Sequence, residues 1–259
     1  MKIKILSKKG ENLKFVLEGA TPAFANSMRR IMIAEVPNLT IDTVEFHDNT
    51  SALFDEIVAH RLGMIPLEFD PEKFNMQNDC KCDGKGCPTC QVFFALEKTG
   101  PATAYSSDLK SSNKAVKPTS PDFPIVKLLK EQHIKIEATA RLGTGREHSK
   151  FQTSNATYTY VISVECSRTD DAKKIVNACP KNILEVKGTK VVLADPYECN
   201  ECKACEEAGG GDVKVTGDPS KFVFTVESIS GLDPEYIVGK AAEILEGKAK
   251  EFKDLLKDV

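Results

Sequence analysis

The chain has 259 residues, of which 41% are hydrophobic and 7% aromatic, and these supply enough apolar side chains for two small domains or one domain with insertions. Its 35 basic and 38 acidic residues leave a net charge of -3, which argues against a protein whose whole surface binds nucleic acid. No stretch approaches the roughly 18 to 20 apolar residues of a membrane-spanning helix, and the first residues lack the apolar region of a signal peptide, so we expect a soluble, cytoplasmic protein without membrane contact.

The first two thirds of the chain predict short strands and two helices. A helix is expected over residues 22–36, because Thr21 can cap it, and a second over residues 51–62, where Ser51 can serve as the cap. Residues 99–124 are rich in Pro, Ser and Lys and predict a long surface loop. Alternating or β-branched patterns predict strands over residues 3–6, 13–17, 43–46, 91–97, 134–140 and 158–164.

The composition changes near residue 166, and residues 166–218 read as an inserted module with short helices and a Gly-rich loop. A strand over residues 222–227 and a final helix opened by Asp233 and Pro234 follow. The apolar stripe of that helix either packs on the chain's own core or forms a dimerisation surface, and the stripe alone does not choose. It consists of Ile237, Ala241, Ile244, Leu245, Phe252, Leu255 and Leu256.

Four cysteines within eleven residues form a first cluster with metal-ligand spacing: Cys80-x-Cys82-x4-Cys87-x2-Cys90. In a reducing compartment such clusters are metal ligands more often than disulfides. Four thiolates suit a tetrahedral zinc, and because they leave no open position the zinc would be structural. The alternative is a reduced loop without metal.

The second cluster has the spacing of an iron–sulfur protein. Cys199-x2-Cys202-x2-Cys205 supplies a triplet, and Cys179, followed by Pro180, supplies a fourth ligand, as in bacterial ferredoxins. We expect one 4Fe-4S cluster here. A 3Fe-4S cluster held by the triplet and a zinc ion held by the same four cysteines remain as alternatives.

A second cluster in this module is not expected. Its triplet would need cysteines at Thr169, Ala172 and Ile175, and its fourth ligand would lie at Gly209. The remaining cysteine, Cys166, is interpreted as a small core residue or a free thiol.

No motif in the sequence predicts an active site. The segment from Gly143 to His148 lacks the third glycine and the Lys-Ser/Thr pair of a phosphate-binding loop, so we expect a turn. There is no nucleophile elbow and no Asp-rich metal motif. The histidines show no metal-binding pair and no evident nucleophile partner; they are His47, His60, His133 and His148.

Two segments resemble the α-type subunits of cellular RNA polymerases. Residues 24–37, Phe-Ala-Asn-Ser-Met-Arg-Arg-Ile-Met-Ile-Ala-Glu-Val-Pro, resemble the first helix of these subunits. Residues 54–67, Phe-Asp-Glu-Ile-Val-Ala-His-Arg-Leu-Gly-Met-Ile-Pro-Leu, resemble the next segment of the archaeal and eukaryotic members. Residues 105–109 and 145–151 extend the resemblance, and the loop 80–90 is similar to the zinc loop of the eukaryotic third-largest subunit, apart from one extra residue.

The resemblance implies an α+β fold with three parts. Residues 1–40 and 219–259 would form a discontinuous α-subunit-like dimerisation domain of a sheet and two helices. Residues 41–165 would form an inserted, mainly-β domain that carries the zinc loop. Residues 166–218 would form a ferredoxin-like iron–sulfur domain, which marks the archaeal version of the family.

The resemblance also implies a role and partners. The subunit would belong to a DNA-directed RNA polymerase, a nucleotidyltransferase, without catalytic residues of its own. It would pair with the small subunit L and meet subunits N and P and the second-largest catalytic subunit, with no sequence-specific nucleic-acid contact. Arg29, Arg30, His60 and Arg61 would contact the second-largest subunit, or else lie on solvated helix faces or in internal ion pairs. Ile237, Ile244, Leu245 and Phe252 would contribute to pairing with subunit L.

Two rival interpretations come from other classes of protein. The cysteines alone would suit a ferredoxin-like electron-transfer or redox-sensing protein with an accessory zinc site, but such a protein has no need of residues 1–78. A zinc-bearing nucleic-acid binder is disfavoured by the acidic balance and by the lack of interleaved aromatic and basic residues.

Overall fold

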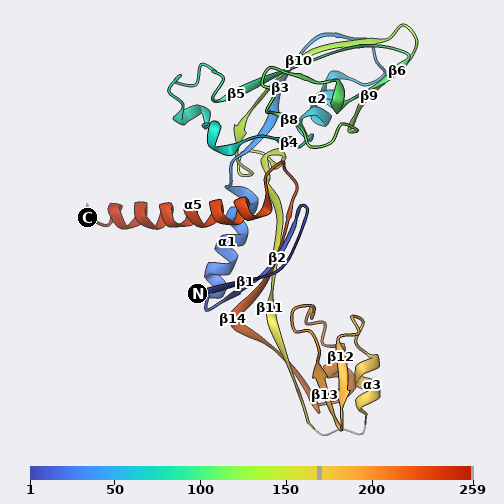
Figure 1. Ribbon diagram of the computed structural model, residues 1–259, viewed down its shortest axis with the longest axis vertical. Helices are drawn as coiled ribbons and strands as arrows, with labels where there is room; N and C mark the ends of the chain where they lie inside the picture. Colours follow the sequence, from blue (N-terminus) through green and yellow to red (C-terminus); the bar gives the residue numbers. More distant parts are fainter. Residues whose placement is uncertain (168–170, 258–259) are drawn as a thin grey trace. The chain divides into compact units, whose positions relative to one another are not determined.

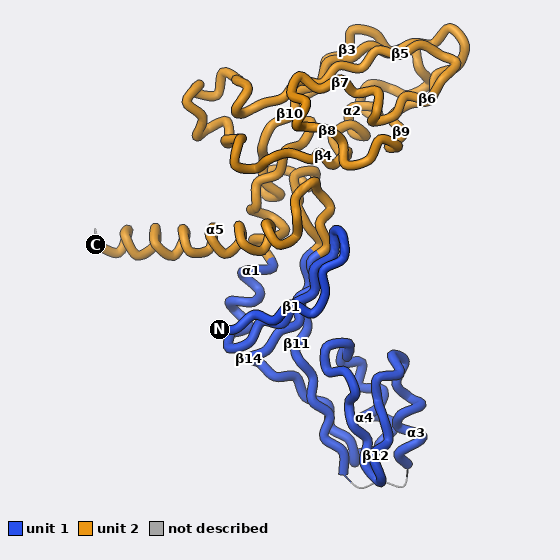
Figure 2. Tube along the Cα trace, viewed as in Figure 1, with its two compact units in different colours: residues 1–29, 156–226 blue, residues 30–155, 227–259 orange. Residues whose placement is uncertain are grey.

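A computed structural model describes residues 1–167 and 171–257, which form a mixed α/β structure of two compact units. The first unit contains residues 1–29 and 156–226, and the second contains residues 30–155 and 227–259 (Figure 2). Each unit therefore joins segments that are far apart in the sequence. The three-part division expected from the family resemblance stays a prediction.

The first unit is built on a four-stranded sheet with the strand order β1-β2-β14-β11. Phe15 of β2 stacks on Phe224 of β14, with ring centroids 5.1 Å apart, which places large apolar side chains at the centre of the sheet. The predicted cap of α1 is confirmed, because Thr21 Oγ1 accepts a hydrogen bond from the Phe24 N–H at 3.2 Å. The bounds are β1 Lys2–Lys9, β2 Asn12–Glu18, α1 Pro22–Ala34, which continues into the second unit, β11 Ser154–Cys166 and β14 Val213–Ser228.

A small module lies between β11 and β14 in the same unit and has a core of its own. It contains α3 (Ala172–Asn177), β12 (Leu184–Lys187), β13 (Lys190–Leu193) and α4 (Ala204–Gly209). Its core joins strand residues to two of the predicted cluster ligands, and it consists of Ile162, Ala172, Ile175, Cys179, Leu184, Val191, Cys205, Val213 and Val215.

The second unit is built on a sheet with the order β3-β10-β5-β7, in which the long central strands are antiparallel (Figure 1). Alternate residues of β5 and β10 are buried, so one face of the sheet is apolar and the other polar. Two small sheets, β4-β8 and β6-β9, complete the unit. The strands are β3 Asn38–Asn49, β4 Leu67–Glu68, β5 Gln91–Thr99, β6 Ala102–Tyr105, β7 Lys110–Ser111, β8 Lys117–Pro118, β9 Pro124–Leu128 and β10 His133–Gly143.

The helices of the second unit are α2 (Asp55–Gly63) and the 22-residue α5 (Pro234–Leu255). α5 begins as predicted, because Asp233 caps it by accepting from the Glu235 N–H at 2.8 Å. Four short 3-10 turns link the strands: η1 Pro71–Lys73, η2 Gln77–Asp79, η3 Ser106–Asp108 and η4 Ser149–Phe151.

Two predictions for this unit were wrong. α2 begins at Asp55 and not near Ser51, because the Ser51 hydroxyl bonds to Asn49 Oδ1 at 2.6 Å and to the Leu53 carbonyl instead of capping a helix. Residues 99–124 are not one long loop, since they contain short strands that pair with distant partners and bury several side chains. No helix among the described residues is long and apolar enough to cross a membrane.

Gly231, between β14 and α5, lies so close to β4 that a Cβ atom would be 1.9 Å from the Leu67 carbonyl oxygen. We expect Gly231→Ala to lower the free energy of unfolding by about 2 to 3 kcal/mol, because the backbone must move apart. The matched control is Gly239→Ala in α5, where a Cβ meets nothing within 4 Å. That change should stabilise the protein by about 0.5 to 1 kcal/mol. Chemical unfolding followed by circular dichroism measures both, and equal effects would contradict the prediction.

Candidate functional site

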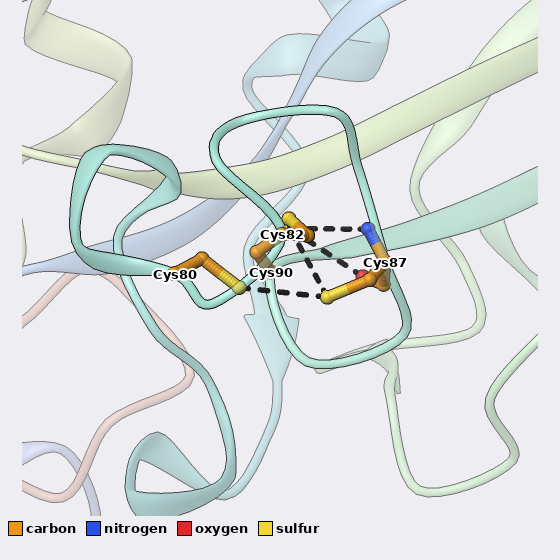
Figure 3. A group of neighbouring side chains, drawn as sticks. All are labelled: Cys80, Cys82, Cys87 and Cys90. Atoms are coloured by element: carbon orange, nitrogen blue, oxygen red, sulfur yellow. Dashed lines mark hydrogen bonds between the residues drawn. The ribbon is translucent and has the colours of Figure 1, made fainter.

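The four cysteines of the first cluster converge on one point in the second unit, as Figure 3 shows. The sulfur of Cys80 lies 3.5 Å from that of Cys87, and Cys90 Sγ lies 3.6 Å from Cys82 Sγ and 3.7 Å from Cys87 Sγ. A zinc ion with bonds of about 2.3 Å in a tetrahedron would hold its sulfurs about 3.8 Å apart. These three distances are close to that value, and all four sulfurs lie within 4.8 Å of one another, so the cluster could hold a metal ion.

The backbone of the loop explains how four side chains meet so tightly. Asp83, Gly84 and Gly86 have φ angles of 51°, 75° and 88°, in the left-handed region that reverses the chain between the two cysteine pairs. The Cys87 N–H donates to Cys90 Sγ at 3.2 Å, and this hydrogen bond orients the sulfur. Cys90 immediately precedes β5, so the loop is fixed to the sheet.

The surroundings of the thiols in this loop shift their pKa values in opposite directions. Hydrogen bonds from Thr89, first from its side chain and then from its backbone, lower the pKa of Cys87 to about 6, and a backbone hydrogen bond from Cys82 lowers the pKa of Cys80. Burial raises the pKa of Cys90 to about 12. A bound cation would have to favour the thiolate at Cys90, whereas Cys87 is ready to ligate at neutral pH.

The second set of cysteines lines one cavity in the module of the first unit. Cys179 and Cys205 are buried, Cys199 is half-buried and Cys202 is exposed. Glu201 and Lys203 take left-handed φ angles of 55° and 61°, which bends the chain twice within the triplet. The remaining walls are mostly apolar, and include Val164, Ile183, Leu184, Leu193 and Val215.

The spacing of the sulfurs separates the two sets. Among the residues that the structure describes, only the Cys80 set has its ligand atoms all within 4.8 Å of one another. The sulfurs of the cavity-lining set are therefore more widely spaced than those of the Cys80 set. Burial raises the pKa of Cys199 and of Cys205, and neighbouring thiols of the set add to both shifts.

The positions at which a second cluster would need ligands hold other residues. Thr169 lies outside the described residues. Ala172 and Ile175 are core residues, and a Cβ on Gly209 would come within 2.9 Å of Val213. Cys166 is partly buried against the same core, and its thiol donates to the Ser167 carbonyl at 3.0 Å.

The four predicted contact residues lie on two helices. On α1, Arg29 donates to Asn26 Oδ1 at 3.0 Å and Arg30 is exposed. On α2, His60 is exposed beside a groove, and Arg61 Nη1 donates to the Ile125 carbonyl of β9 at 2.8 Å. Arg61 thus holds α2 in place within its own unit, whatever else it contacts.

The sequence analysis missed an apolar surface on α2. Phe54, Ile57 and Met64 are all exposed and recur at intervals of three and seven residues, so they share one side of the helix. The buried residues Val58 and Leu62 lie on another side. The interval pattern was visible in the sequence and could have shown two apolar faces on this helix.

α5 carries its apolar residues in two different environments. Ile237 and Ala241 are buried, and Ile244 and Leu245 are half-buried. Toward the C-terminal end the stripe is exposed, with fractions of 65% for Phe252, 60% for Leu255 and 58% for Leu256. The helix therefore continues past the core that covers its first turns.

His133 and its neighbours Thr50 and Asp48 resemble a catalytic arrangement, but their hydrogen bonds do not support one. His133 lies between Thr50, at 3.3 Å from Nδ1, and Asp48. The Thr50 hydroxyl, however, accepts from the His133 N–H at 2.8 Å and bonds to the His133 carbonyl at 3.2 Å. The Thr50 hydroxyl thus donates one hydrogen bond and accepts another at the end of the β3–β10 strand pair. It is therefore not free to act as a nucleophile.

Comparison with known proteins identifies the class of this fold. Residues 41–167 match the RNA polymerase Rpb3/RpoA insert domain, the domain of α-type polymerase subunits. The chain is 38% identical to DNA-directed RNA polymerase subunit Rpo3 of Archaeoglobus fulgidus over 262 residues, covering 99% of this chain and 98% of the relative. It is 39% identical to Rpo3 of Methanosarcina acetivorans, with 99% and 98% covered, and 38% identical to Rpo3 of Pyrococcus furiosus, with 97% and 95% covered. The chain belongs to the Rpo3 family of archaeal α-like polymerase subunits.

A charge network lies beside the groove at His60. Asp42 of β3 accepts from Arg141 Nε at 2.7 Å and from Lys150 Nζ at 2.5 Å, and both cations lie 5.1 Å from the Phe151 ring centroid. Burial alone would raise the pKa of Asp42, but the hydrogen bonds from Lys150 and Arg141 outweigh it and hold the pKa below 3.8.

This network predicts a pH-dependent effect of Asp42→Asn. Because the folded-state pKa is depressed, the carboxylate stabilises the fold above its ordinary pKa and loses that effect as the pH falls through the folded value. We expect the variant to be about 2 kcal/mol less stable at neutral pH. The difference should shrink below about pH 4, as measured by unfolding across pH. The control is Asp122→Asn at an exposed site, and a pH-independent difference for Asp42 would contradict the prediction.

Proposed function

We propose that this chain is a non-catalytic assembly subunit of an archaeal DNA-directed RNA polymerase, the α-like subunit with a ferredoxin-like iron–sulfur domain, and that it pairs with the small subunit L. The family supports the polymerase role, and the exposed end of the α5 stripe is the observation that supports pairing. Phe252, Leu255 and Leu256 expose apolar surface side by side on one helix, and such surface favours burial against another apolar helix. The pair would form the platform on which the catalytic subunits assemble, in the cytoplasm and without membrane contact.

The other contacts are proposed along α1 and α2. Arg29 and Arg30, with His60 and Arg61, would face the second-largest catalytic subunit, and the apolar side of α2 would contact it as well. Subunits N and P are the other proposed neighbours. Arginine, methionine and aromatic residues are enriched in subunit contacts relative to the rest of a protein surface. No sequence-specific nucleic-acid contact is proposed.

The two cysteine sets are proposed as structural metal centres. Cys80, Cys82, Cys87 and Cys90 would hold one zinc ion, supported by their sulfur distances. Cys179, Cys199, Cys202 and Cys205 would hold one 4Fe-4S cluster, or a 3Fe-4S cluster on the triplet, supported by their shared apolar cavity and wider spacing. A dedicated electron-transfer protein is not favoured, because the relatives match along nearly the whole chain.

The pairing proposal predicts that replacing Phe252 and Leu255 together by Ser weakens binding to co-expressed subunit L by about 100-fold or more, since central apolar anchors dominate interface energies. The matched control is Leu129→Ser, because Leu129 is an apolar residue of similar exposure, 57%, in a turn between β9 and β10. Calorimetry of the purified chains measures both affinities. An unchanged affinity for the double variant, or a wild-type chain that ignores subunit L, would overturn the proposal.

The metal proposal predicts one zinc and three or four irons per chain in protein purified without oxygen. Cys80→Ser should remove the zinc and leave the iron, because one thiolate of a closed tetrahedral site is lost. Cys202→Ser should lower the iron content and destabilise the module while leaving the heterodimer largely intact. Cys166→Ser is the control and should change neither metal. Eight irons per chain, or zinc at both sites, would contradict the assignment.

A further inference from the structure

The C-terminal end of α1 carries a carboxylate in an unfavourable place. α1 ends at Ala34, and the next residue, Glu35, has a side chain that is only 13% exposed. The last carbonyl groups of a helix carry partial negative charge, so a partly buried carboxylate there is destabilising unless cations compensate it. Glu35 therefore depends on the charges that surround it.

Two cations from distant segments of the same unit supply that compensation. Arg146, in the turn after β10, donates from Nη2 to Glu35 Oε1 at 2.6 Å, and Lys248 of α5 forms an ion pair with Glu35 Oε2. The Arg146 N–H also donates to the Ala34 carbonyl at 3.0 Å. Glu35 thus joins the end of α1, the turn after β10 and the second half of α5.

The turn that carries Arg146 is seated directly on α1. A Cβ on Gly145 would lie 2.7 Å from the Ile33 carbonyl oxygen, so a side chain at that position would push the turn away. The segment from Gly143 to His148, predicted as a turn without an active site, therefore fixes one side of the Glu35 cluster.

Lys248 attaches the part of α5 that lies beyond its buried base. It follows Ile237 and Ala241 at helical intervals and shares their side of the helix, but Ala241 is the last buried residue of α5. Phe252 lies 15 positions after Ile237, or about 22 Å along the helix, so a tilt of about 10° at the base would move Phe252 by about 4 Å. Packed interfaces do not absorb such a displacement.

We propose that Glu35, Arg146 and Lys248 are positioning residues that fix the direction of α5, so that its exposed apolar end meets the partner subunit in one orientation. This inference rests on the proposed pairing with subunit L. It assigns to the turn after β10 a part in pairing, although that turn belongs to the insert-domain region of the chain.

The test compares Lys248→Gln, Lys248→Arg and Glu35→Gln in the full chain. Calorimetry with subunit L should show binding weakened about tenfold for Lys248→Gln and for Glu35→Gln, and within about twofold of wild type for Lys248→Arg, which keeps the charge. The double variant Glu35→Gln/Lys248→Gln should bind subunit L no more weakly than either single variant does. The matched control is Lys250→Gln, because the ion pair of Lys250 lies within α5, with Glu246 at 2.7 Å.

A second measurement tests whether Glu35 and Lys248 are adjacent in the absence of subunit L. A carbodiimide, which joins a carboxylate to an adjacent amine without a spacer, should couple Glu35 to Lys248 in the free chain, as detected by mass spectrometry. Helix content and melting temperature should stay near wild type for the Gln variants, which separates positioning from folding. If Lys248→Gln binds as tightly as wild type, or the cross-link is absent, the positioning role is overturned. If the wild-type chain does not bind subunit L, the pairing proposal fails, and this inference fails with it.

Discussion

The structure of the second unit depends on the apolar stripe of α5, which is buried in the core at the start of the helix and exposed at its end. Burial of Ile237 and Ala241 fixes the base of the helix, because removing apolar surface from water is the dominant favourable term in folding. The same stripe continues beyond that core to Phe252 and Leu255, where no described part of the chain covers it. A helix built in this way is a core element in its first half and exposes apolar surface in its second half.

The two cysteine sets lie in regions where apolar packing is limited. The loop around Cys82 consists largely of turns and glycines, and few of its residues are buried. The module around Cys205 has a small core in which two of the four cysteines are themselves buried members. In both places a metal centre would add the cross-links that a larger hydrophobic core supplies elsewhere.

Much of this arrangement could be predicted from local sequence signals. The spacing of Cys80 to Cys90 encodes a convergence that the structure shows, and Asp233 with Pro234 marks the start of α5. The short strands within residues 99–124 could not be predicted, because strands of two to five residues carry no period and their partners lie elsewhere in the chain. Ser51 was misassigned as a cap because its alternative partner, Asn49, is a local competitor that pattern rules ignore. The pairing of Glu35 with Lys248 joins residues more than two hundred positions apart and leaves no pattern at all.

The way the module is joined to its unit has a further consequence. β11 and β14 are neighbours in the sheet, and Ser163 and Thr216, whose hydroxyl oxygens lie 2.8 Å apart, bond across them near the point where the module begins. The module therefore lies between the ends of two strands that are already neighbours in the sheet. Shortening both strands by equal lengths would leave an ordinary hairpin and an undisturbed sheet. The cysteine-bearing module can thus be gained, reduced or lost during evolution without any change in the register of the strands that support it.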